Sequence, residues 1–284
     1  MIANAFEYTA PQSLTEALTL IAGGAKPLSG GMSLIPMMKL RLAAPEHLVD
    51  LARLKELNYI REENGELHIG ATTTYYDLES SPLLRGKCPL MAETATHVGD
   101  IQVRNMGTLG GSVAHADPAA DFPAALQALE AKIVLCSSTG SRTVTAKDFF
   151  LDVFTTALEP GEIVAEIVVP VEPGLVGTSY QKCRQPASGF ALVGVAARVR
   201  QEAGLVSMLR IGVTGVSGSA YRAANVEAAL EGKAPTDENI RAAAALVADG
   251  IDAGADLHAS ADYRKHLASV YTAKAIRAAL SRCA

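Results

Sequence analysis

Apolar and polar residues near the start of the chain repeat with the period of a helix. Within residues 14–21, the apolar side chains lie at i, i+3, i+4 and i+7, which places them on one helical face. Ser13 and Glu16 have the spacing of a capping box at the start of this segment, and Gly23 follows its end. The pattern therefore predicts a helix with one buried face.

Shorter apolar runs predict strands and further helices through the next half of the chain. Asn64 and Gly65 separate two alternating runs, which is the strongest short-range signal for a β-hairpin. Residues 137–140 separate a second such pair. Strands are expected at residues 25–28, 47–51, 59–62, 67–70, 132–136, 142–145 and 162–169. Helices are expected at residues 34–40, 75–78, 89–98, 122–129 and 146–150.

The last third of the chain has a different order, with long strands first and helices after them. Strands followed by helices predict an α+β unit whose helices lie on one face of a sheet. Pro170 and Pro173 precede residues 174–177, where we expect the domain boundary, so the expected domains are residues 1–173 and 174–284. The expected strands are residues 178–184, 190–199 and 208–216, and the expected helices are residues 223–230, 236–248 and 261–280.

Composition narrows the class of protein. Of 284 residues, 49% are hydrophobic and 19% are charged, which is typical of a compact globular protein. A net charge of −5 argues against a general nucleic-acid binder, because backbone phosphates require a basic face. No secretory signal and no apolar run of about 20 residues is recognisable, so a cytoplasmic protein without a transmembrane segment is expected.

The four cysteines are scattered and include no C-x-x-C pair. Neither a zinc site nor an iron–sulfur cluster is therefore predicted within this chain. Isolated cysteines of this kind are typical of a reducing compartment.

Two segments rich in glycine and hydroxyl side chains are the candidate binding elements. Residues 28–34 and residues 107–112 each lead into a predicted helix. Glycine allows positive φ and close approach of a ligand, and exposed amides in such turns suit phosphate oxygens. Neither segment fits the Rossmann or P-loop pattern. Two turns that bind one dinucleotide and two ordinary turns before helices both remain open from the residues alone.

Each charged side chain near these two segments can be explained either by a structural role or by a role in ligand binding. Asp121 precedes the predicted helix 122–129, so it is either a simple N-cap or a ligand-binding carboxylate. Lys182 is either an edge-strand lysine or a cation beside the site. His115 and Asp117 lie two apart in a predicted loop, which does not bring them face to face, and no catalytic residue is assigned.

Residues 29–41, together with residues 102–105 leading into residues 108–111 and Asp121, resemble the FAD-binding medium subunit of molybdenum hydroxylases. The likeness is strongest to the carbon monoxide dehydrogenase type and weaker to the flavin domain of xanthine oxidoreductase. It covers almost the whole chain. This sequence departs at Met32, where the family often has His, and at Ser112, where it often has Asn.

The resemblance implies an α+β fold with an FAD-binding domain of the para-cresol methylhydroxylase (PCMH) or vanillyl-alcohol oxidase type. That domain has two α+β subdomains with FAD between them, and a small C-terminal domain with a three-stranded sheet and helices follows. Asp121 would hold the ribose or diphosphate region, Val164 would pack against the flavin, and Lys182 would lie near it. The FAD-binding residues implied are Leu28, Ser29, Gly30, Gly31, Met32, Ser33, Leu34, Val98, Gly99, Thr108, Gly110, Gly111, Ser112, Asp121, Val164 and Lys182.

The resemblance also implies partners. FAD would take electrons from [2Fe-2S] clusters in a small subunit, whose source is a molybdenum cofactor in a large subunit, and deliver them to an external acceptor. The complex would be a dimer of heterotrimers, in the cytoplasm or against the inner membrane face. A stand-alone PCMH-type flavin oxidase or reductase and a flavin-free assembly subunit are the alternatives. Substrate (carbon monoxide, an aldehyde or an N-heterocycle) and acceptor (quinone, NAD or oxygen) remain open.

Overall fold

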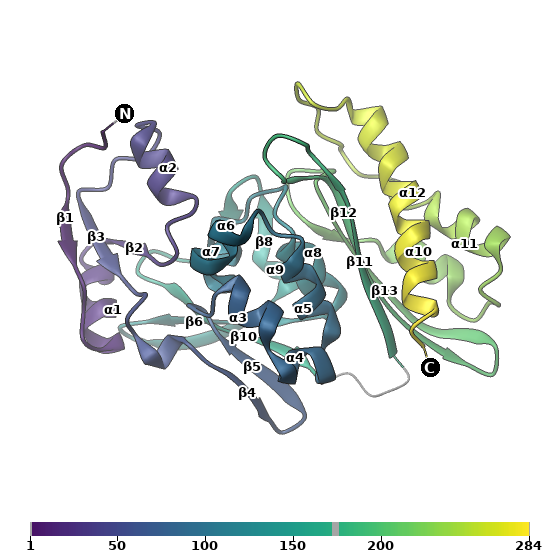
Figure 1. Ribbon diagram of the computed structural model, residues 1–284, viewed down its shortest axis with the longest axis horizontal. Coiled ribbons are helices and arrows are strands. Elements are labelled where there is room, and N and C mark those ends of the chain that lie inside the picture. Colours follow the sequence, from purple (N-terminus) through teal and green to yellow (C-terminus); the bar gives the residue numbers. More distant parts are fainter. Residues whose placement is uncertain (1, 172–175, 284) are drawn as a thin grey trace.

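Three layered parts follow one another along the long axis of the molecule (Figure 1). A computed structural model describes residues 2–171 and 176–283. The parts are a small N-terminal lobe, a central sheet covered by helices, and a C-terminal sheet with helices on its outer side. The α+β fold class expected from the sequence is confirmed.

The N-terminal lobe is built on a three-stranded parallel sheet in the order β1 (Glu7–Thr9), β3 (His47–Asp50), β2 (Lys26–Leu28). Ser13 caps helix α1 (Leu14–Ala22) by accepting from the Glu16 N–H, as expected, but the Glu16 carboxylate accepts from the Gln12 N–H, so the capping box forms only in part. The buried face of α1 shares one core with β3. Helix α2 (Leu34–Lys39) follows the first glycine-rich segment. Strand β1 was not predicted, because its three residues carry no buried alternation.

The central part is a five-stranded antiparallel sheet with β10 (Ile163–Pro170) in the middle. A run of β-branched residues makes β10 suitable for this central position, since it is buried on both faces over most of its length. The order across the sheet is β4 (Ile60–Glu63), β5 (Glu66–Gly70), β10, β6 (Lys132–Ser137), β7 (Gly140–Thr145).

Short helices cover one face of this sheet (Figure 1). They are α3 (Tyr75–Ser80), α4 (Pro82–Lys87), α5 (Pro89–Thr96), α6 (Ile101–Met106), α7 (Leu109–His115), α8 (Phe122–Ala128) and α9 (Ala146–Phe149). A 3-10 turn at Lys55–Leu57 precedes β4, and a short hairpin of β8 (Phe150–Asp152) and β9 (Thr155–Thr156) follows α9. Helices α4 and α6 were not predicted, because each has only six residues and too few apolar repeats to show a period.

The C-terminal part is an antiparallel sheet of β11 (Val176–Arg184), β12 (Ala191–Glu202), β13 (Leu205–Thr214) and β14 (Tyr221–Arg222). Three strands were expected, and the two-residue β14 is the addition. Helices α10 (Ala224–Leu230), α11 (Asp237–Ala244) and α12 (Ala261–Leu280) share a core with one face. The helix expected at residues 236–248 is shorter in the structure, where α11 ends at Ala244, whereas α12 has the expected bounds of 261–280.

The other face of the C-terminal sheet packs against the central part. Tyr180 and Ala196 belong to the central core, while Val193 and Val195 of the same sheet belong to the C-terminal core. Helix α8 lies against β13 so closely that a Cβ at Gly212 would overlap the carbonyl oxygen of Ala124. The expected domain boundary at residues 174–177 lies partly outside the described residues. No helix within the described ranges is both long and apolar enough to cross a bilayer.

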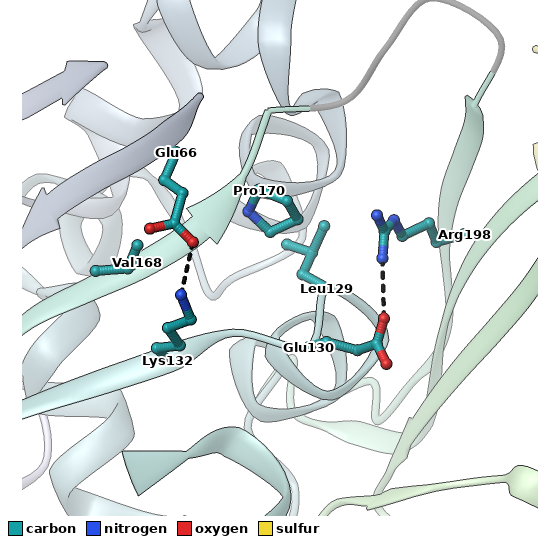
Figure 2. A pocket seen from close by; sticks show the side chains of 7 residues that line it. All are labelled: Glu66, Leu129, Glu130, Lys132, Val168, Pro170 and Arg198. Carbon is teal, nitrogen blue, oxygen red and sulfur yellow. Dashed lines mark hydrogen bonds and ion pairs between the residues drawn. The ribbon is translucent and has the colours of Figure 1, made fainter. Parts of the chain in front are cut away.

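Glu130 joins the two parts electrostatically. Glu130 lies just after α8 and has a left-handed backbone conformation, with φ 53°. Its carboxylate accepts a hydrogen bond from Arg222 at 2.7 Å and lies 3.3 Å from both Arg198 and Arg210 of the C-terminal sheet. Burial raises the pKa of this carboxyl, but the arginines outweigh that effect and lower its pKa overall. Glu130 and Arg198 line a cleft of about 160 Å³. Figure 2 shows this pair together with the Lys132–Glu66 pair in the same cleft.

Replacing Glu130 with Gln removes the charge that these arginines share. Because the folded pKa lies below the ordinary value of 4.5, the carboxylate stabilises the fold above that pH and loses its contribution as the pH falls through the folded pKa. We expect Glu130→Gln to lower the free energy of unfolding by about 1 kcal/mol at neutral pH, since solvent screens a half-exposed group. The difference should shrink in acid. Urea titrations at several pH values measure it, with the exposed Glu202→Gln as control; a pH-independent difference contradicts the account.

Candidate functional site

One large cavity, of about 950 Å³, lies between the N-terminal lobe and the central part. Its walls come from the two glycine-rich segments, the chain after α5, the start of β10 and the loop before β12. Fifteen of the sixteen residues implied by the resemblance line this cavity, although they are spread from Leu28 to Val164. Lys182 is the exception, and its side chain lies behind the wall.

The two glycine-rich segments touch each other at one edge of the cavity. The hydroxyls of Ser29 and Thr108 are 3.0 Å apart, although 79 positions separate these residues. A Cβ at Gly30 would overlap the carbonyl oxygen of Met106 and come within 2.8 Å of the Cα of Gly107. Backbone therefore packs on backbone here, and only glycine at position 30 allows it.

The first segment presents a row of free amide donors. The N–H groups of residues 29–34 donate to no acceptor within residues 2–171 and 176–283, and Ser33 makes no side-chain cap. Gly31 has φ +72°, a conformation that L side chains rarely adopt. Since backbone donors in a partly buried segment need a partner, these consecutive amides are available to a ligand in the cavity.

The second segment differs from the sequence expectation. Gly107, Gly110 and Gly111 do not have positive φ, and Gly110 and Gly111 lie within α7 instead of a turn. The amides of residues 109–112 already donate to Thr73, Ala71 and Thr108. Gly110 is required because a Cβ there would meet Ala71, so this segment supplies close approach and hydroxyl groups, not free amides.

Asp121 projects a carboxylate that is almost fully buried. It forms no cap hydrogen bond at the start of α8, so the plain N-cap alternative is wrong. Instead, Oδ1 accepts from the Tyr180 hydroxyl at 2.6 Å and Oδ2 from the Lys182 ammonium at 2.8 Å. Burial raises the pKa of Asp121 and lowers the pKa of Lys182, while each partner favours the charged form of the other.

Several residues that line the cavity were not assigned to the site from the sequence: loops bring Phe154, Phe190 and Gly161 there, whereas His115, which had been expected in a loop, is the last residue of α7. His115 and Phe154 lie at its edge with ring centroids 4.9 Å apart, and burial lowers the pKa of His115. Phe190 lies on the loop between β11 and β12. The positive φ of Phe154 belongs to the β8–β9 hairpin, whose short strands give no readable pattern. Gly161, which follows Pro160, and Gly189, which follows Ser188, line the cavity in turns that their dipeptides could have indicated.

The chemistry of this cavity suits a dinucleotide and offers no metal site. Among the described residues, no group of three metal-ligating side chains occurs. Neutral amides and the hydroxyls of Thr108 and Ser112 can bind phosphate oxygens without a cation. Asp121 suits sugar hydroxyls, while Val98 and Val164 provide apolar wall for a ring system. The residues present therefore fit FAD.

Comparisons with known proteins agree with this geometry. Residues 4–172 match the model of the FAD binding domain in molybdopterin dehydrogenase, and residues 178–279 match the CO dehydrogenase flavoprotein C-terminal domain. The chain is 43% identical to the carbon monoxide dehydrogenase medium chain of Hydrogenophaga pseudoflava, with full coverage of both. It is 40% identical to the glyceraldehyde dehydrogenase medium chain of Sulfolobus acidocaldarius, over 96% of this chain and 97% of that one.

A solved structure is similar over its whole length. Carbon monoxide dehydrogenase from Hydrogenophaga pseudoflava, in a form lacking the Mo-pyranopterin moiety of the molybdenum cofactor, superposes with a TM-score of 0.97 at 45% identity and full coverage of both chains.

Gly30→Ala tests the backbone contact between the two segments. The added methyl group has no space, so we expect the free energy of unfolding to fall by about 1–3 kcal/mol, as for other overpacked sites. Gly86→Ala is the matched control, because Gly86 lies in α4 with nothing within 4 Å of an added Cβ. That control should be neutral or stabilise by up to about 1 kcal/mol. Urea denaturation measures the free energy of unfolding of both variants. An equal change in Gly30→Ala and Gly86→Ala would contradict the proposed backbone contact.

Proposed function

The chain belongs to the family of FAD-binding medium subunits of CO dehydrogenase-type molybdenum hydroxylases, and on this premise we propose that its cavity holds FAD and passes electrons onward. It is thus an oxidoreductase subunit with an FAD-binding domain. The observation that carries the proposal is the row of amides at residues 29–34, which have no acceptor within residues 2–171 and 176–283 and lie along a cavity of about 950 Å³. We further propose residues 1–173 as the FAD domain and 174–284 as the C-terminal domain.

Residues 29–34 would hold the diphosphate of FAD. Amides without internal acceptors gain their hydrogen bonds from phosphate oxygens, and no side-chain cation has to be desolvated for this. The hydroxyls of Thr108 and Ser112 complete the phosphate site from the opposite segment. Met32, in the place where the family often has His, contributes its amide in the same way.

Asp121 and the apolar wall orient the rest of the cofactor. A carboxylate repels phosphate and accepts hydrogen bonds from hydroxyl groups, so Asp121 suits the ribose. Val98 lies just after α5, and Val164 lies at the start of β10 beside a β-bulge. Their side chains exclude water from the ring system. No residue of this chain is assigned as an acid or a base.

When bound, FAD supplies the ability to accept electrons one at a time and to release two together. We propose that these electrons come from [2Fe-2S] clusters of a small partner subunit, reduced in turn by a molybdenum cofactor in a large subunit, within a dimer of heterotrimers. The chain is about equally similar to medium chains of enzymes named for carbon monoxide and for glyceraldehyde. This supports a substrate site on the large subunit, away from this chain.

FAD titration of the purified chain tests the cofactor site. We expect one FAD per chain, a yellow product and, at a free FAD concentration 100 times Kd, a gain of about 2.7 kcal/mol in the free energy of unfolding. Absorbance after gel filtration and thermal denaturation measure these quantities. A colourless protein with an unchanged melting temperature would refute the proposal.

Gly31→Ala separates the amide row from general backbone strain. It forces a side chain onto φ +72° beside Ile35, so both stability and the direction of the amides change. Gly65→Ala is the matched control, since Gly65 has φ +79° in a hairpin and no atom of the described residues lies within 4 Å of an added Cβ. We expect a similar stability loss of about 1 kcal/mol in both. Only Gly31→Ala should raise the Kd for FAD, by about tenfold or more. Equal FAD affinities would argue against the amide row.

A further inference from the structure

We infer that the C-terminal sheet builds the Asp121 corner of the cavity, with Tyr180 and Lys182 acting as positioning residues that do not touch the cofactor. This inference rests on the proposed function, because it assigns roles within the same FAD site. It also changes the role that the resemblance implies for Lys182, from a cation beside the flavin to a support behind the wall.

Tyr180 and Lys182 reach the carboxylate from one strand. They lie two positions apart on β11, so their side chains leave the same face of the sheet. Tyr180 is fully buried, and the side chain of Lys182 is 1% exposed. Neither residue lines the cavity, whereas Asp121 does. The two donors therefore fix both oxygens of Asp121 from behind and leave its remaining lone pairs for a ligand.

Lys182 also holds a second part of the wall. Its ammonium donates to the carbonyl oxygen of His97 at 2.9 Å. His97 directly precedes Val98 and Gly99, which line the cavity, and its ring meets the Tyr180 ring edge-on with centroids 5.4 Å apart. One buried cation thus sets the position of two wall segments relative to each other.

The strand opposite β11 is adapted to this arrangement. A Cβ at Gly194 of β12 would overlap the Tyr180 hydroxyl, so glycine there leaves the space that the hydroxyl occupies. On β13, the buried hydroxyl of Thr214 contacts the carbonyl oxygens of Pro118 and Ala120 at 2.7 and 2.8 Å. The C-terminal sheet therefore anchors the backbone before Asp121 as well as its side chain.

Tyr180→Phe is the primary test, because it removes one hydroxyl and keeps the packing of the ring. We expect the Kd for FAD to rise about tenfold, the usual scale for losing a hydrogen bond to a charged group. Tyr221→Phe is the matched control. It removes a tyrosine hydroxyl from the same sheet, where it donates to Val247 at 3.0 Å, and should leave the Kd within twofold of wild type. Equilibrium dialysis gives Kd, and circular dichroism confirms folding.

A double-mutant cycle separates positioning from a general loss of stability. If Tyr180 acts only through the carboxylate, Tyr180→Phe should raise the Kd no further in an Asp121→Asn background. Lys182→Met, which keeps the apolar stem, provides a second single variant with the same expected weakening should the cycle proteins fold poorly. Equal Kd values for wild type and Tyr180→Phe, or equal weakening by Tyr221→Phe, overturn the inference alone. Failure of wild type to bind FAD overturns the proposed function with it.

Discussion

Contact between two backbone segments is the constraint on which the rest of the structure depends. Gly30 lies on the Met106–Gly107 peptide, and any side chain at position 30 would separate the N-terminal lobe from the central part. The hydroxyls of Ser29 and Thr108 meet beside this contact. The contact lets the cavity have one wall of free amides and another of hydroxyl groups without a side chain between them.

The two walls contribute by different physics. Residues 29–34 offer backbone donors that have no acceptor in the described part of the chain, so binding an anion would satisfy them. The amides of residues 109–112 already donate to Thr73, Ala71 and Thr108, so this segment forms a wall of the cavity whose backbone donors are satisfied internally. The corner at Asp121 depends on a third part of the chain, since β11 and β13 hold it from behind. The cavity is therefore a product of all three parts of the fold.

Much of this could be predicted from sequence, and the failures have physical causes. Helical periodicity predicted α1, because this helix buries one regular face. A continuous run of β-branched residues predicted the central strand β10, which is buried on both faces over most of its length, and α12 has the expected bounds. Sequence patterns missed α6 and β14, whose two to six residues are held by tertiary contacts. Gly110 and Gly111 line the cavity, but neither has the positive φ expected from the sequence. Glycine is needed at 110 because a Cβ there would contact Ala71, which no local pattern reveals. Likewise, Lys182 looks like an edge-strand lysine, and only the fold buries it against Asp121.

Hydrogen–deuterium exchange at residues 29–34 tests the central claim most directly. These amides have no acceptor among the described residues, so they should exchange rapidly in the protein without FAD and become strongly protected once FAD is bound. The amides of residues 109–112, which are already bonded internally, should change much less. Rapid exchange at residues 29–34 in the FAD-saturated protein would contradict the account.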